Sequence, residues 1–332
     1  MSKIAKAVLD KDSYRSPLSN PTVRICTFTF LAIVVLIIVG NILSPGFGSP
    51  AGIISTLALS SVLAIACIGQ TLIITSGNGG LDLSIDSMIS MGAIMGAVFA
   101  GMEGDHLVRA LVGLTLLGGG IGLINGLIIN YIKVPPFVLT MAMATVVRGA
   151  VVAYTGGAPS GRAPKLLLEI STGNAFGHVR WLIVVGMAVT VLIQLLLSRT
   201  KFGRGLFLVG TNRNTALLSG VNISFIVVMT YVIAGIFNSM SGFLLLGVVG
   251  SATINIGDGY TIMTIAAVVI GGTALSGGKG SFFGAALGAI LMIVLSSVLI
   301  AVNIPQGMRT FIQGLILLFM ITAYTRDLKL RA

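Results

Sequence analysis

With 55% hydrophobic and only 9% charged residues, this chain of 332 residues has too little charge to cover the surface of one soluble core. The formal charge is +11, but the basic residues flank apolar runs instead of clustering on a polar face, which excludes a nucleic-acid-binding protein. Lipid is therefore the expected solvent of nearly the whole chain, and the predicted fold is all-α, a polytopic bundle of membrane helices.

Ten apolar runs are long enough, or nearly so, to cross a bilayer as helices. The first follows about two dozen polar residues without a small-residue cleavage site, so we expect a retained span rather than a signal peptide. The connections at Gly77–Gly80 and Gly277–Gly280 are either simple hairpins or places where a helix is broken and re-enters the membrane. The expected spans are 25–43, 52–75, 82–101, 107–131, 136–155, 180–198, 225–249, 261–276, 281–301 and 308–324.

These spans form one expected transmembrane domain, residues 25–324, between an N-terminal tail of residues 1–24 and a C-terminal tail of residues 325–332. With the N-terminus inside, the cytoplasmic segments hold fourteen of the twenty Lys and Arg residues, the outer loops hold five, and Arg148 lies within a span. This positive-inside bias predicts that both termini are cytoplasmic. The outer five are Arg109, Arg162, Lys165, Arg180 and Arg309.

The two cysteines, Cys26 and Cys67, fall inside apolar runs. We expect both to be small buried hydrophobic side chains, and we predict neither a disulfide nor a metal site.

Glycines recur at every fourth position in two runs, which lets helix backbones approach closely in lipid. We expect these glycines to serve the close packing of helices rather than a direct role in function. These glycines are Gly118, Gly122 and Gly126, and then Gly280, Gly284 and Gly288.

Two connections are longer than a hairpin needs. The outer one, residues 156–179, contains Pro159 and Pro164 and several glycines, so it is either an irregular surface facing a soluble partner or a mere tether. The cytoplasmic one, residues 199–224, predicts a two-turn helix that begins after Thr211 or Asn212 and stops at Gly220. Such a helix is too short to be stable alone, and it either lies in a groove on a partner or is a plain connector.

A phosphate-binding loop of the form G-x-x-x-x-G-K-[ST] is missing. The nearest candidate surrounds Lys279, but Thr273 stands where the first glycine is needed and Gly280 follows the lysine. We therefore expect no ATP hydrolysis and no catalytic residue on this chain.

Buried ionisable residues, which ion-coupled carriers need at membrane depth, are rare. His106 and His178 fall in outer loops, and only Asp82 and Asp86 among the acidic residues are expected close to a span, on one face of the third helix. Asp82 either caps that helix through backbone N–H groups or lines a substrate or gating path. Arg148 either snorkels to the headgroups or makes an interhelical ion pair or a polar contact in the pathway.

A path lined by Ser, Thr, Asn and backbone groups suits a neutral polar solute, a description that sugars fit. Each candidate could instead hydrogen-bond between helices, and for each one alone this is the more ordinary role. The pathway candidates are Asp82, Ser84, Asp86, Asn125, Thr140 and Asn238, with Thr145 and Gln194 as further polar residues at membrane depth.

Four stretches, in this order, resemble the permeases of the ribose-type family of sugar ATP-binding-cassette importers. They are GQTLIITSGNGGLDLSIDS from Gly69, NGLIINYIKVPPFVLTMAMATVVRG from Asn125, RTKFGRGLFLVGTNRNTALLSGVN from Arg199 and GYTIMTIAAVVIGGTALSGGKGS from Gly259. The resemblance extends over residues 50–324, and the four stretches together are a specific signal.

The resemblance implies an inner-membrane assembly of two permease subunits on two ATPase subunits, with ATP and Mg²⁺ bound on the ATPases and no cofactor on this chain. A periplasmic or lipid-anchored binding protein would deliver a monosaccharide, and ATP-driven movement of a coupling helix would switch the bundle between outward-open and inward-open states. Nucleosides, amino acids and furanosyl signal molecules are the alternative solutes, and an ion-coupled carrier is the alternative class. The implied coupling residues are Asn212, Arg213, Ala216, Leu217, Ser219 and Gly220.

The chain departs from the family pattern in three places. Asn78 and Gly79 are extra, and Asp86 replaces the usual glycine. Asn214 and Thr215 stand where acidic residues are frequent, and residues 261–264 also lack the acidic residues often found after Tyr260. These changes would suit a permease that pairs with a non-identical sister subunit.

Overall fold

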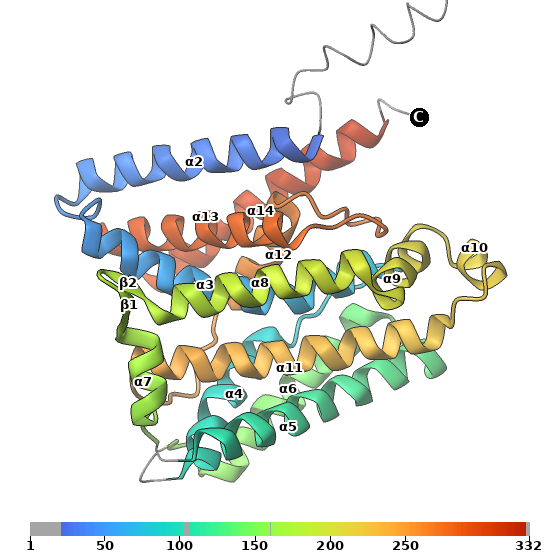
Figure 1. Cartoon of the computed structure of the whole chain (residues 1–332), viewed down its shortest axis with the longest axis horizontal. Coiled ribbons are helices and arrows are strands. Elements are labelled where there is room, and N and C mark those ends of the chain that lie inside the picture. The colour runs from blue at the N-terminus through green and yellow to red at the C-terminus, as the bar shows by residue number, and fades with distance from the viewer. Residues whose placement is uncertain (1–20, 102–105, 160, 330–332) are drawn as a thin grey trace, which may run out of the picture.

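The computed structural model describes residues 21–101, 106–159 and 161–329, so residues 1–20 of the predicted N-terminal tail and 330–332 of the predicted C-terminal tail lie outside the described residues. Most of the described chain is helical, and the long helices lie side by side in one bundle (Figure 1). The helices are α2 (Pro21–Leu43), α3 (Pro50–Thr75), α4 (Ile85–Ala100), α5 (Leu107–Leu127) with the π-helical turn η2 (Ile128–Ile132), α6 (Pro136–Thr155), α7 (Lys165–Thr172), α8 (Trp181–Arg199), α9 (Lys201–Thr211), α10 (Arg213–Leu218), α11 (Ile223–Val249), α12 (Tyr260–Ile270), α13 (Phe282–Ala301) and α14 (Gln306–Lys329).

The all-α membrane bundle predicted from the sequence is confirmed. Within the described residues, seven helices are long and apolar enough to cross a membrane, and three shorter apolar helices overlap the remaining predicted spans. The number of crossings stays a prediction. Four boundaries differ from the predictions by three residues or more: α2 begins at Pro21 rather than residue 25, α4 begins at Ile85 rather than residue 82, α12 ends at Ile270 rather than residue 276, and α14 ends at Lys329 rather than residue 324.

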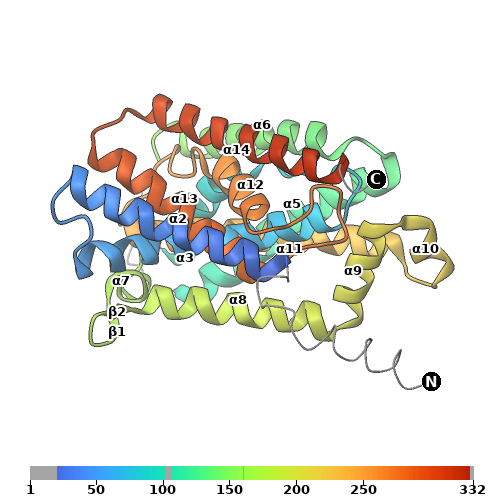
Figure 2. The ribbon, with the colours of Figure 1, turned by 90° about the horizontal axis from the view of Figure 1, so that it is seen from above.

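The two ends of the bundle differ. At one end, here called the α7 end, α7 and the short antiparallel hairpin of β1 (Asn174–Phe176) and β2 (Val179–Arg180) cover the helix tips (Figure 1). At the other, the α10 end, α10 projects beyond the long helices, as the view from above shows (Figure 2). The start of α2 and the end of α14 both lie at the α10 end, although the side of the membrane that this end faces stays a prediction.

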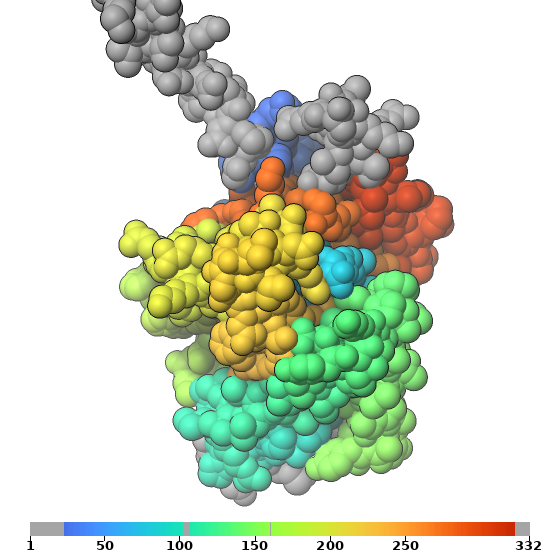
Figure 3. All heavy atoms as spheres, turned by 90° about the vertical axis from the view of Figure 1, so that its right-hand side faces the viewer, coloured from blue at the N-terminus to red at the C-terminus, as the bar shows by residue number. Residues whose placement is uncertain are grey.

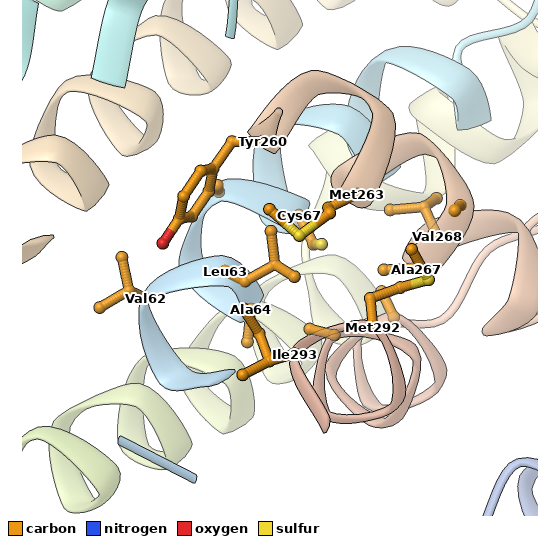
Figure 4. Close-up of a cluster of buried hydrophobic side chains, with 14 of the residues drawn as sticks. Val62, Leu63, Ala64, Cys67, Tyr260, Met263, Ala267, Val268, Met292 and Ile293 are labelled. Carbon is orange, nitrogen blue, oxygen red and sulfur yellow. The ribbon is translucent and has the colours of Figure 1, made fainter. Parts of the chain in front are cut away.

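The core of the bundle forms around α3 and α11, which are the most deeply buried of the long helices. The short helices α4 and α12 are inside as well, whereas α2 and α6 lie at the periphery and expose apolar side chains, as expected of surfaces that meet lipid or another membrane protein. Figure 4 shows the largest buried cluster, in which α3, α12 and α13 contribute Leu63, Cys67, Met263, Met292 and Ile293.

Both cysteines are free, and Cys67 is fully buried as predicted. Cys26 is only partly buried, because it lies on the peripheral helix α2.

Glycines allow the helices to touch backbone to backbone, as predicted. A Cβ atom at Gly122 of α5 would lie 2.2 Å from the carbonyl oxygen of Tyr231 on α11, and one at Gly288 of α13 would lie 2.0 Å from that of Ala267 on α12. A Cβ at Gly284 would lie equally close, 2.0 Å, to the carbonyl oxygen of Gly271. Both predicted glycine runs are therefore packing surfaces.

Candidate functional site

The connection between α3 and α4, residues 76–84, enters the bundle in a non-helical conformation. Gly77, Asn78 and Gly79 have positive φ angles, and the chain then extends through Asp82 to Ser84. Because Asp82 precedes the helix, it does not share a helical face with Asp86, contrary to the prediction. We refer to residues 81–84 as the inner segment.

Asp82 is buried and satisfied by neutral hydrogen-bond donors. Its Oδ1 accepts from the backbone N–H of Ser84 at 2.8 Å and from the Ser84 hydroxyl at 2.6 Å, and its Oδ2 accepts from Asn238 Nδ2 on α11 at 3.1 Å. Asp82 thus accepts a backbone N–H, as the helix-cap interpretation expected, but the donor precedes the first turn of α4. The carboxylate holds the inner segment against α11.

Two further helices hold the same segment. Thr140 Oγ1 on α6 accepts from the N–H of Leu83 at 3.0 Å, and Gln70 Oε1 on α3 accepts from the N–H of Asp82 at 3.3 Å. Among the predicted pathway residues, Asp82, Ser84, Thr140 and Asn238 therefore meet at one place.

Gln70 was missed by the sequence reasoning, although a glutamine inside an apolar run was a usable signal. Two buried polar atoms here lack a hydrogen-bond partner, Gln70 Nε2 and Asn238 Oδ1. Buried polar groups normally find partners, so these atoms leave hydrogen-bonding capacity at the inner segment.

The other polar candidates lie elsewhere. Asn125 is buried with an unpaired Oδ1, and Thr145 is exposed and bonds only to Met141 of its own helix. Gln194 on α8 accepts from the N–H of Phe282 at 3.0 Å and so caps the start of α13. Neither Thr145 nor Gln194 belongs to the cluster at the inner segment.

Asp86 joins the first turn of α4 to the first turn of α12. Its carboxylate accepts from the backbone N–H groups of Gly259, at 3.2 Å, and of Thr261, while its own N–H donates to Thr261 Oγ1 at 3.1 Å. Each helix therefore receives a cap from the other, which satisfies N–H groups that a helix start leaves free. The negative charge also suits the positive end of each helix dipole.

Both helices are short for a bilayer. With 16 residues α4 is about 24 Å long, and with 11 residues α12 is about 17 Å long, against a hydrocarbon core of about 30 Å. The inner segment leads into α4 from the α10 end, and residues 250–259 lead into α12 from the α7 end, where Gly250 accepts a bond from Ala163. The two helix starts thus meet within the bundle, an arrangement that broken helices of transporters use at binding sites.

Arg148 forms an ion pair with Asp258, next to the start of α12. This partner was missed, since only Asp82 and Asp86 among the acidic residues were expected close to a span. The pair replaces the snorkelling interpretation. The two side chains are 44% and 41% exposed although Arg148 lies about two turns inside α6. Charged groups at such depth avoid lipid chains, so this face borders water or another protein.

We expect the Arg148–Asp258 pair to show measurable energetic coupling. Arg148→Asp or Asp258→Arg alone places like charges together and should lower the free energy of unfolding in detergent by about 1 kcal/mol, the upper range for exposed pairs. The double reversal should recover most of the loss. If the double variant instead loses as much as the two single variants together, the two charges are not energetically coupled.

At the α10 end, the predicted short helix is confirmed as α10. Asn212, rather than Thr211, is the N-cap, and its side chain accepts from the N–H of Thr215 at 3.1 Å. Gly220, with φ at +75°, ends the helix through bonds from its own N–H to Leu217 and from Val221 to Ala216. Both ends of α10 are therefore fixed by local bonds.

The side chains of α10 differ in exposure. Ala216 is buried, Leu217 and Leu218 are 64% and 89% exposed, and Arg213 is half-buried with an unpaired Nε. Burial lowers the pKa of Arg213. Two exposed leucines on a fixed helix are an unusual feature of a surface that projects from the bundle.

Across the described ranges, no three His, Cys, Asp or Glu side chains gather into a group that could hold a metal ion. The expectation that this chain carries no cofactor stays a prediction.

Comparison with known proteins gives consistent matches. The family model described as branched-chain amino acid transport system / permease component matches residues 52–321. Ribose import permease protein RbsC of Bacillus subtilis (strain 168) is 32% identical over 299 residues, covering 87% of this chain and 89% of that protein.

Two further relatives show similar coverage. RbsC of Escherichia coli (strain K12) is 30% identical over 294 residues, covering 87% of this chain and 90% of that protein. Galactose/methyl galactoside import permease protein MglC of the same organism is 29% identical over 331 residues, covering 94% and 96%. No solved structure gives a significant match.

Proposed function

Because the chain belongs to the family of branched-chain amino acid transport system / permease components, we propose that it is the membrane subunit of an ATP-binding-cassette importer that carries a monosaccharide. Membership makes the chain a multi-pass protein of the inner membrane and a transport component rather than an enzyme. ATP and Mg²⁺ would bind on a separate ATPase subunit.

The proposed substrate class rests on the relatives and on the chemistry of the polar cluster. The relatives are import permeases for ribose and for galactose or methyl galactoside. The groups at the inner segment are amides, hydroxyls and a carboxylate already satisfied by neutral donors. Such groups suit the hydroxyls of a neutral sugar. An amino acid is the second candidate, because the family description names branched-chain amino acids.

The observation that carries the proposal is α10. A two-turn helix fixed at both ends, with Leu217 and Leu218 exposed at its tip, suits a groove on an ATPase subunit. Beside it lies a surface hollow of about 390 Å³, lined by Lys201, Arg204 and Phe225 among others. An ATPase docked there would push on α10 during its nucleotide cycle.

The other partners would occupy the remaining surfaces. A second permease, identical or a non-identical sister, would cover the face that carries the half-exposed Arg148–Asp258 pair. A solute-binding protein would dock at the α7 end, where Phe176 of the β1–β2 hairpin is 71% exposed.

Reconstituted uptake tests this proposal. The chain would be co-purified with its ATPase and binding protein, and uptake of labelled ribose and galactose measured with ATP on the α10 side. Leu217→Asp/Leu218→Asp should lower ATPase co-purification and uptake about tenfold or more, because two apolar anchors are lost from the interface. Leu166→Asp, at a 51% exposed leucine of α7, is the matched control and should keep ATPase binding.

A different outcome would point to a different class. Uptake that needs no ATPase and follows an imposed ion gradient would make the chain an ion-coupled carrier, and Asp82 and Asp86 would then be the first residues to examine.

A further inference from the structure

Three chain segments meet through glycines at the α10 end of the bundle. They are the end of α9 with Gly210, the start of the α3–α4 connection with Gly77, and the α12–α13 connection with Gly277 and Gly278. We call these four residues the glycine junction. Figure 3 looks at this end, with α9 and α10 in yellow beside the orange α12–α13 connection.

The contacts in the junction are between backbones. A Cβ atom at Gly210 would lie 1.9 Å from the carbonyl oxygen of Thr75 and 2.5 Å from the amide nitrogen of Gly278. One at Gly277 would lie 2.5 Å from Gly77 Cα and 2.8 Å from the carbonyl oxygen of Gly210. The N–H of Gly278 also donates to Thr75 at 2.9 Å. The Thr211 hydroxyl, 2.3 Å from a Cβ atom built at Gly278, is the one side-chain atom in these contacts, so little can give way when a segment is displaced.

Each segment leads directly to a part of the candidate site. Gly77 opens the connection that becomes the inner segment and α4, and the α12–α13 connection begins where α12 ends. In the remaining segment, only Asn212 separates the end of α9 from α10. The junction is therefore the point where the end of α9, which leads into α10, contacts the connections next to α4 and α12.

We infer that the glycine junction transmits the movement of α10 to α4 and α12, with Gly210 as its central positioning residue. Densely packed backbones have low compressibility, so a displacement of the end of α9 must move Gly77 and Gly278 or break their contacts. Since α4 and α12 cap each other through Asp86 and Thr261, both helix starts would shift together. The inference deepens the proposed function and depends on it.

Gly210 is suited to a test, because alanine there affects the contact without harming the helix. Gly210 lies in the last turn of α9 and has no positive φ, so alanine fits its backbone and has the better helix propensity, by about 1 kcal/mol. Gly77, Gly277 and Gly278 have φ values of +74°, +87° and +73°, and substitution there would strain the backbone itself.

In the full complex, we expect Gly210→Ala to separate ATP hydrolysis from transport. Binding-protein-stimulated ATPase activity should stay within about twofold, while sugar taken up per ATP falls about tenfold, since the methyl group displaces Thr75 and Gly278. Gly120→Ala, in the middle of α5, is the control, because nothing lies within 4 Å of a Cβ atom built there. This control variant should leave the amount of sugar taken up per ATP unchanged.

A second measurement covers the case in which Gly210→Ala does not assemble. Asn78 and Thr211 are both exposed and can carry spin labels. The distance between the two labels should be the same in the nucleotide-free and ATP-trapped states, because the junction moves as a unit. A separation that changes between the states, or a Gly210→Ala complex that couples like the wild type, overturns the inference. If the wild-type complex itself shows no ATP-dependent uptake, the proposed function fails instead.

Discussion

Gly122→Val will prevent the bundle from forming, whereas Gly120→Val, two residues away on the same helix, will be tolerated. The added Cβ at Gly122 would lie 2.2 Å from the carbonyl oxygen of Tyr231, a backbone atom that cannot turn aside. At Gly120 nothing lies within 4 Å. We expect a loss of about 3 kcal/mol or more at Gly122, because α5 must move away from α11 along their shared length.

The comparison controls for helix propensity. Glycine to valine changes the intrinsic preference of α5 by the same amount at both positions, so the difference between the variants reports the contact alone. The measurement is the monodisperse fraction after detergent extraction, together with the midpoint of thermal unfolding. Equal loss in both variants would show that α5 does not pack on α11 through this face.

Asp82→Ala will abolish transport, and Asp82→Asn will largely retain it. Alanine leaves the N–H of Ser84 and the amide of Asn238 buried without their acceptor, at about 1–3 kcal/mol for each group. Asparagine keeps an oxygen that accepts from Ser84, and it turns its amide NH2 group toward Asn238. Because Asn238 Oδ1 has no partner, the Asn238 side-chain amide can flip, and its Oδ1 can then accept a hydrogen bond from the NH2 group of the new asparagine.

Uptake and thermal unfolding of the two variants, and of Asn238→Ala in each background, would measure these bonds. Asp82→Ala and Asn238→Ala should be strongly non-additive, since they remove the same hydrogen bond. If Asp82→Asn is as damaging as alanine, the negative charge itself is required, and the carboxylate acts on something other than Ser84 and Asn238.

Long apolar helices were the part of the fold most open to sequence reasoning. The expected span 136–155 coincides with α6, and 181–199 of α8 differs from its prediction by one residue at each end. A bilayer fixes the length that an apolar run needs, so these helices carry a strong signal. The α10 helix was predictable for another reason: its N-cap and its terminal glycine are local in sequence.

The broken segments were less predictable, because their conformation depends on partners far along the chain. Residues 82–84 resemble the start of a helix in composition, yet hydrogen bonds to Gln70, Thr140 and Asn238 hold this segment outside the helix. Asp258 could not be matched with Arg148 either, since the two lie 110 residues apart and only the return of the 250–259 connection into the bundle brings them together. Which candidate residues cluster was therefore a question of tertiary structure.

The position of the two described chain ends has a practical consequence. Because α2 starts and α14 finishes at the same end of the bundle, a peptide joining the end of one copy to the start of another need not cross the bilayer. A single polypeptide holding two permease units in tandem is thus compatible with the fold. In such a tandem, a substitution can be placed in one half only, so each half of a paired transporter can be examined while the other keeps its native sequence.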